Sequence, residues 1–380
     1  MQKRNNGLDG LRWFAVTLVI LSHCDILKQG AVGNCIFFTL SGFLAILPFV
    51  ENGEDRFAHP GNILKYYAGR FLRIVPVFWV CLIAVWLLMP YRYFDIFDMK
   101  TDSSLILNLL FIRARKHLWF LQQEIVFYLM CPFILLLIVG FKKLFKNIWI
   151  RVTKETAEPG SAGAQVADLA TSVLLAVLAF VYYANLHDTP IKLMARERLM
   201  PFELHQFLIG MAFGYIYRVV AIYADKIRQH KSAGIIGSVY MCLFVLFCIL
   251  SSRTFLEVYF DDEGLDDYLI GWEQPMLFGC LSGIFIILLL VENDGWFARA
   301  LGNRFTAYLG RISFEMYILH VFFLKAFDQP SQYRQCVLVY SVTIAVSIVV
   351  HNYVEKPCIR FAKNLKFKDV VAYYKCTVNR

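Results

Sequence analysis

Windows of about 20 apolar residues, each bounded by charged residues, recur along this chain of 380 residues. A helix needs roughly 20 such residues to cross a bilayer, since the hydrocarbon core is about 30 Å thick. With 58% hydrophobic and 18% charged residues, the chain carries more apolar surface than a soluble globule covers. The sequence therefore predicts an all-α, multi-pass transmembrane bundle of about ten helices. The candidate windows are 8–27, 31–50, 74–90, 117–140, 166–184, 202–222, 234–251, 270–291, 306–326 and 336–354.

Basic residues divide unevenly between the segments that connect these windows. If the N-terminus is cytoplasmic, the inner segments are 51–73, 141–165, 223–233, 292–305 and 355–380. They hold 21 of the 38 lysine and arginine residues, whereas the outer loops hold 11. Cytoplasmic loops of membrane proteins are enriched in these residues, so both termini are predicted to be cytoplasmic.

The same reasoning limits what the charge says about domains and partners. The net charge of +9 is explained by topology, and no basic stretch interleaved with aromatic residues indicates a nucleic-acid partner. We expect one domain over 1–380, with a core at about 7–361 and a basic cytoplasmic tail at 362–380 that sits on membrane lipid. The ten cysteines are scattered, and no CxxC pair or His/Cys cluster predicts a metal or a disulfide framework, although a few could still pair.

The first window contains three ionisable residues, Asp9, Arg12 and His23. A charged side chain at the centre of a membrane helix costs roughly 2.5–3.5 kcal/mol on insertion scales, so it normally faces protein or a cavity. Eleven residues separate Arg12 from His23, which places both on one helix face about three turns apart. They predict a functional face, or alternatively a basic anchor and a histidine satisfied in the core.

Further polar residues fall inside other windows. Glu124 lies about two turns from the outer end of its window, and Ser313, Tyr317 and His320 form one helical stripe. Under the predicted topology, Glu124 and His320 lie toward the outer surface of the membrane with His23. The arginines inside the same windows lie toward its inner surface. A second inner cluster, Lys65, Arg70 and Arg73, suits either positive-inside anchoring or contact with phosphate.

Six segments carry a resemblance to a known family. They are LDGLRxxAVxxVxxxH at 8–23, FFxLSGFL at 37–44, RxxRIxP at 70–76, WxLxxExxFYxxxP at 119–132, GxxSxxxYxxH at 310–320 and ExP at 355–357. In this order they resemble the acyltransferase 3 family of integral membrane acyltransferases. The resemblance implies transfer of an acyl group, most often acetyl, from acyl-CoA to a hydroxyl of a cell-envelope carbohydrate or lipid-linked glycan. It also implies the inner, cytoplasmic membrane as the location.

We assign roles to the candidate residues on this basis. His23 is the candidate general base, and His320 is the alternative base. Arg12, Arg70 and Arg73 are candidates for binding the negatively charged CoA portion, and Arg12 could instead fix its helix against Asp9. Glu124 could orient a histidine or bind the acceptor. A rival hypothesis is a transporter or flippase that uses the buried charges as a relay.

Overall fold

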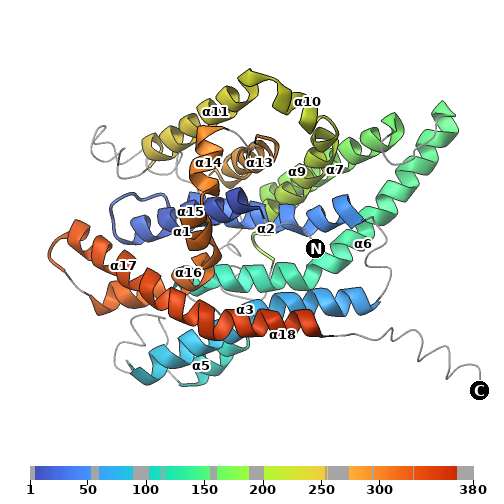
Figure 1. The fold of residues 1–380 in the computed structure, drawn as a ribbon. Helices are drawn as coiled ribbons and strands as arrows, with labels where there is room; N and C mark the ends of the chain where they lie inside the picture. Colours follow the sequence, from blue (N-terminus) through green and yellow to red (C-terminus); the bar gives the residue numbers. More distant parts are fainter. Residues whose placement is uncertain are drawn as a thin grey trace, which may run out of the picture. The chain divides into compact units, whose positions relative to one another are not determined.

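The computed structural model describes residues 5–52, 60–88, 102–112, 114, 116–154, 161–187, 201–252, 255, 274–292, 295–327 and 329–365. The chain divides into two compact units. Unit 1 consists of Met1–Leu44, Asp168–Thr189 and Glu203–Ser347, and unit 2 of Ala45–Ala167, Pro190–Phe202 and Ile348–Arg380. Every regular element in the described ranges is a helix, which confirms the all-α, multi-pass class (Figure 1). The expectation of a single domain over 1–380 stays a prediction.

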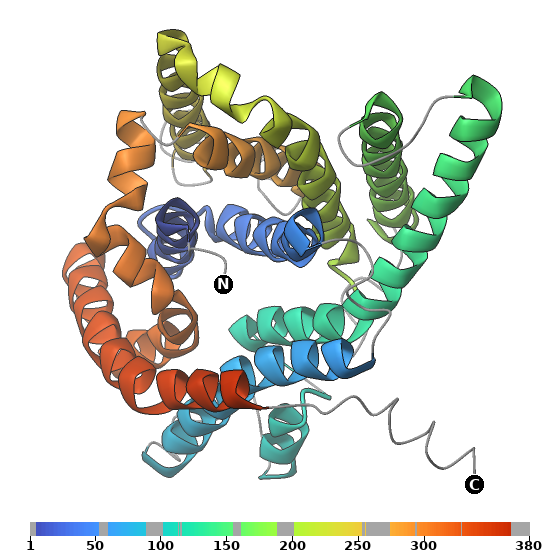
Figure 2. The same cartoon turned by 45° about the vertical axis from the view of Figure 1, so that its right-hand side comes forward.

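Unit 1 combines the first helices of the chain with helices of its middle and C-terminal parts. It contains α1 (Asn6–His23), the first part of α2 (Gly30–Asn52), most of α7 (Ala162–His187), α9 (Leu204–Ile222), α10 (Ala224–Gln229), α11 (Lys231–Leu250), α13 (Pro275–Val291), α14 (Trp296–Gly302), α15 (Arg304–Arg311), α16 (Ser313–Ala326) and most of α17 (Gln332–Val350). Helix α13 runs alongside α9, and α1 contacts α14, α15 and α16 (Figure 2).

Unit 2 holds the long helices of the first half of the chain together with the last described segment. It contains α3 (Pro60–Leu88), α5 (Asp102–Leu109), η2 (Lys116–Leu118), α6 (Trp119–Thr153), η3 (His351–Glu355) and α18 (Lys356–Asn364), with the remaining parts of α2, α7 and α17. Helix α18 packs along α3, and α3 also contacts α6 (Figures 1 and 2).

Helix α1 begins at a defined N-cap. The side-chain oxygen of Asn5 accepts hydrogen bonds from the backbone N–H groups of Gly7 (2.8 Å) and Leu8 (3.2 Å). These are two of the N–H groups that a helix start leaves without an internal partner. Asp9 adds a negative charge in the first turn, where the helix dipole favours it. The polar start of the first window is therefore a helix-initiation signal as well as a set of candidate site residues.

Glycine lets α1 approach its neighbours at backbone distance. A Cβ on Gly10 would lie 1.9 Å from the carbonyl oxygen of Leu301, and one on Gly310 would lie 1.6 Å from the carbonyl oxygen of Asp9. Any larger residue would push α14 or α15 away from α1. Because α1 and α15 carry Asp9 and Arg311, this close packing positions the charged residues described below.

Up to nine of the ten predicted windows correspond to candidate membrane-crossing helices. Among the described residues, seven helices are long and apolar enough to cross a membrane, or nine if two bent pairs each count as one crossing. The pairs are α13 with α14, bent by 92°, and α15 with α16, bent by 68°. Helix α1 is not among the seven. Its polar residues lower its mean hydropathy, and it fits its surroundings because residues such as Leu11, Ala15 and Val16 are fully buried against protein.

Two helices extend well beyond their apolar windows. Helix α3 begins at Pro60, although its window begins at 74, and α6 continues to Thr153, although its window ends at 140. The charged residues of these extensions lower the hydropathy without breaking the helix. As a result, Arg70 and Arg73 lie within α3 and not in a connecting loop.

Candidate active site

Two histidines of unit 1 form a hydrogen-bonded pair. His23 is the last residue of α1, and His320 lies in α16. Nδ1 of His23 lies 2.8 Å from Nε2 of His320, and Nδ1 of His320 lies 3.2 Å from the carbonyl oxygen of Met316. His320 is completely buried, whereas His23 is exposed. The structure thus brings together the two histidines that the sequence offered as alternatives.

The hydrogen bonds assign the protons of this pair. The Met316 carbonyl can only accept, so Nδ1 of His320 carries the proton of that bond. In a neutral His320 the other nitrogen, Nε2, is then an acceptor, and Nδ1 of His23 must donate to it. The remaining nitrogen of neutral His23, Nε2, keeps its lone pair. His23 can therefore take up a proton, while His320 holds its ring in place.

Aromatic side chains fix the position of this pair. The two imidazole rings stack with centroids 5.0 Å apart. Tyr317 places its ring edge-on to His320 at 5.7 Å, and Phe37 of α2 meets Tyr317 edge-on at 6.4 Å. Tyr317 belongs to the stripe expected from the sequence. Its contact with His320 shows that one part of this stripe faces the histidine pair.

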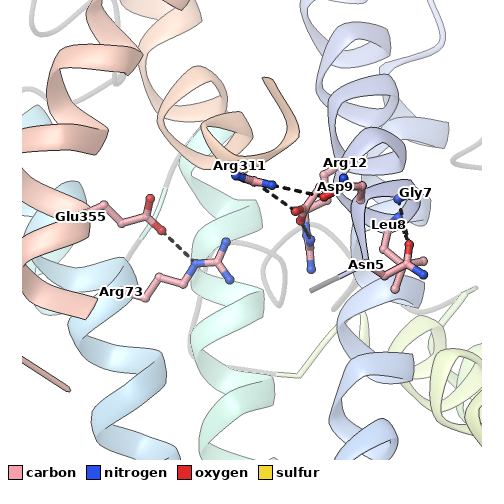
Figure 3. A network of polar contacts seen from close by, with 9 residues as sticks. Asn5, Gly7, Leu8, Asp9, Arg12, Arg73, Arg311 and Glu355 are labelled. Atoms are coloured by element: carbon pink, nitrogen blue, oxygen red, sulfur yellow. Dashed lines mark hydrogen bonds and ion pairs between the residues drawn. The ribbon is translucent and has the colours of Figure 1, made fainter. Parts of the chain in front are cut away.

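Arg12 lies in a second cluster of unit 1, around the buried carboxylate of Asp9. Nη1 of Arg12 donates to Oδ1 of Asp9 at 2.6 Å, and Nε of Arg311 lies 3.5 Å from Oδ2 (Figure 3). Arg311 also donates to the side chain of Asn6 at 3.2 Å. Two guanidinium groups thus share one carboxylate. The contact fits the alternative in which Arg12 fixes its helix against Asp9.

Arg70 and Glu124 are connected through a tyrosine of unit 2. The guanidinium of Arg70 lies over the rings of Tyr128 (4.8 Å) and Tyr66 (5.5 Å). The hydroxyl of Tyr128 donates to Oε1 of Glu124 at 3.0 Å. Among the residues that the structure describes, Arg70 makes no ion pair or side-chain hydrogen bond, so the tyrosines hold the guanidinium by its face. Its N–H donors remain available for a phosphate.

Arg73 has a different environment, one turn further along α3. Its Nε lies 3.1 Å from Oε1 of Glu355, a carboxylate whose side chain is only 1% exposed (Figure 3). The other carboxylate oxygen of Glu355 contacts Nδ1 of His351. Arg73 thus neutralises a buried carboxylate. Of the two arginines assigned to phosphate, Arg70 has the freer guanidinium.

The sequence did not predict three of these contacts. They are the contact of Tyr66 with the guanidinium of Arg70, the contact of Arg311 with Asp9, and the ion pair of Glu355 with Arg73. Tyr66 precedes Arg70 by four residues, so helical spacing would have placed it beside Arg70 if α3 had been expected to begin at Pro60. The pairing of Arg73 with Glu355 joins residues far apart in the sequence, and no spacing within one helix reveals it. The structure brings together His23 with His320 and Arg12 with Asp9 and Arg311 in unit 1, and Arg70 with Glu124 in unit 2.

Comparisons with known proteins place the chain among acyltransferases. A family model described as an acyltransferase domain, Acyl_transf_3, matches residues 5–153 and 164–351. O-acetyltransferase OatA of Staphylococcus aureus is 23% identical over 379 residues, in strain NCTC 8325 / PS 47 and in strain COL alike. The alignment covers 92% of this chain and 56% of the relative, so the chain spans about half the length of these curated relatives. No solved structure matches the chain.

Proposed function

The chain belongs to the Acyl_transf_3 family of acyltransferases and is an O-acyltransferase, and from this premise we propose that it moves an acetyl group from acetyl-CoA to a hydroxyl of a cell-envelope carbohydrate. The relatives named O-acetyltransferase support an acetyl group and a hydroxyl acceptor. The proposed location is the inner membrane, with the acceptor a polysaccharide or a lipid-linked glycan. Family membership argues against the transporter hypothesis.

The observation that carries the proposal is the histidine pair with its free Nε2 on His23. His23 removes the proton of the acceptor hydroxyl as the hydroxyl oxygen attacks the thioester carbonyl. The new C–O bond replaces the C–S bond, and His23 returns the proton to the departing sulfur. During this step the imidazolium of His23 donates from Nδ1 to Nε2 of His320, a charge-assisted bond that is stronger than the neutral one. General-base assistance of this kind contributes typically about 10²–10⁴-fold in rate.

Arginine side chains are proposed to bind the donor. Arg70 would contact a phosphate of CoA through the donors that its two tyrosines leave available. For Arg12 the role in binding the negatively charged CoA portion stays a proposal beside its contact with Asp9. Arg73 would contribute less to donor binding, because its guanidinium already pairs with the carboxylate of Glu355. Glu124 is proposed to bind the acceptor or to orient a histidine.

A comparison of cell-surface glycans tests the proposed function. Three separate cultures are grown in medium that contains [¹³C]acetate. Their cells express the wild-type chain, the His23→Ala variant or no copy of the gene. Their surface glycans are then examined by mass spectrometry for an ester-bound, base-labile acetyl mass. We expect the added mass only with the wild-type chain. Equal acetylation in all three strains would reject the proposal.

A further inference from the structure

Two cysteines of unit 1 meet beside the proposed base. Cys24 directly follows His23 and caps the C-terminus of α1, and Cys336 lies in the first turns of α17. Both are free thiols in the structure, buried to 3% and 6% exposure, and a side-chain hydrogen bond links them. Two thiol groups from opposite ends of the sequence are therefore in contact at one point of the fold.

Tyr340 makes a second connection between α1 and α17. The hydroxyl of Tyr340 lies 2.8 Å from Nε1 of Trp13 and 2.8 Å from Oγ1 of Thr17. Thr17 precedes the C-cap residue Cys24 of α1, and Tyr340 follows Cys336 in α17, so the two contacts come in the order of antiparallel helices. The hydrogen bonds of Tyr340 thus join the two helices that carry the thiols.

The backbone around Cys24 also defines where α1 ends. The N–H of Cys24 closes the last turn by donating to the carbonyl of Ile20 at 3.0 Å. The next residue, Asp25, has φ of 56°, a left-handed conformation that reverses the chain and that residues other than glycine rarely adopt. A covalent link at Cys24 would therefore anchor the turn that immediately follows His23.

We propose that Cys24 and Cys336 form a disulfide bond in the mature protein and that this bond fixes the end of α1 that carries His23. The two thiols give two electrons and two protons to the disulfide of a thiol oxidoreductase, a new S–S bond joins Cys24 to Cys336, and the oxidoreductase is released as a dithiol. Buried thiols react slowly, so the exchange precedes the final packing of α17. The predicted topology places both cysteines at outer helix ends, in the compartment where disulfides persist.

Differential alkylation of the full chain in its own membranes tests the bond. Membranes are quenched in acid, dissolved in denaturant and treated with N-ethylmaleimide, then reduced and treated with isotope-labelled N-ethylmaleimide. We expect peptides containing Cys24 and Cys336 to carry the second label and the peptide containing Cys280 to carry the first. In the Cys24→Ser variant, Cys336 has lost its partner and should carry the first label, the unlabelled N-ethylmaleimide. The first label on both cysteines of the wild-type chain would overturn the proposal.

The link to His23 rests on the proposed function and needs an activity measurement. Cys24→Ser, Cys336→Ser and the double variant each remove the same bond, so we expect the same several-fold loss of acetyl transfer in all three and none in Cys280→Ser. A double variant whose loss equals the product of the two single losses would overturn the link, because independent packing effects multiply. The wild-type chain could also carry the second label on Cys24 and Cys336 and yet show no acetyl transfer. That result would reject the proposed function and leave the proposed disulfide in place.

Discussion

His23 and His320 differ in what their hydrogen bonds leave available. Only His23 has a nitrogen with a free lone pair in the neutral pair, because His320 uses both of its nitrogens. We therefore expect His23→Ala to lose about 10²–10⁴-fold in acyl transfer per amount of inserted protein. His230→Ala is the matched control, since His230 is exposed at the end of α10. Near-normal activity of inserted His23→Ala would remove His23 from the chemistry.

A second substitution separates the roles of the two histidines. Glutamine at position 320 offers a carbonyl oxygen near the place of Nε2, so it can accept the hydrogen bond from Nδ1 of His23, whereas alanine cannot. A hydrogen bond to a charged group is worth about 1.5–3 kcal/mol, which corresponds to roughly tenfold or more in rate. We expect His320→Gln to exceed His320→Ala by that factor in initial rates. Equal loss in both variants would contradict the role of His320 as the acceptor of this hydrogen bond.

Arg70 and Arg73 are neighbours in sequence with different roles. Arg70→Gln should raise the acetyl-CoA concentration needed for half-maximal rate while the protein stays folded, because its guanidinium has no ion pair among the described residues. Arg73→Gln should instead lower thermal stability, since it leaves the buried carboxylate of Glu355 without its arginine. Donor titration and thermal unfolding in detergent separate the effects. The double variant with Glu355→Gln should recover part of the stability, and an unchanged donor dependence in Arg70→Gln would contradict the assignment.

At the scale of elements, the packing of α1 against α14 and α15 depends on glycine. Gly10→Ala would place a methyl group 1.9 Å from the carbonyl of Leu301, so α14 must move and stability must fall. Gly140→Ala in α6 is the matched control, because nothing lies within 4 Å of the new methyl group. There the substitution should be neutral or stabilising by up to about 1 kcal/mol. The apparent melting temperature in detergent measures both, and equal values would show that α1 is not held at backbone contact.

The helices themselves could be expected from the sequence, but their ends and partners could not. Apolar windows locate α2, α9 and α11 because each helix is apolar over nearly its whole length. The start of α3 and the end of α6 were misplaced because these extensions carry charged residues that lower the hydropathy to that of a loop. Spacing within α1 correctly placed Arg12 and His23 on one helix, yet it contains no information about which helix faces them. Pairs such as His23 with His320 form only when distant helices pack.

At the scale of the whole molecule, three apolar helices separate Lys154 from the loop near Asp262, which lies outside the described residues. An odd number of crossings requires the two positions to lie on opposite sides of the membrane. The excess of lysine and arginine in segment 141–165 predicts that Lys154 is cytoplasmic. A reporter inserted at Lys154 should therefore read cytoplasmic and one near Asp262 external. Finding both on the same side would exclude this arrangement of α7, α9 and α11.

Reporters fused to the two ends of the chain test whether α1 and the two bent helix pairs cross the membrane. Among the described helices between the N-terminus and Lys154, α5 has only eight residues and is too short to cross. The long ones are α1, α2, α3 and α6, and of these α1 alone is not apolar enough to count as a crossing by itself. If α1 crosses, these four helices return an N-terminal reporter to the cytoplasmic side, and if it does not, the reporter is external. We expect the cytoplasmic result, because α1 is enclosed by other helices of unit 1 and need not be as apolar as a lipid-facing helix. A reporter after Arg380 should also be cytoplasmic if the two bent pairs both cross or both return, and an external signal would mean that only one of them crosses.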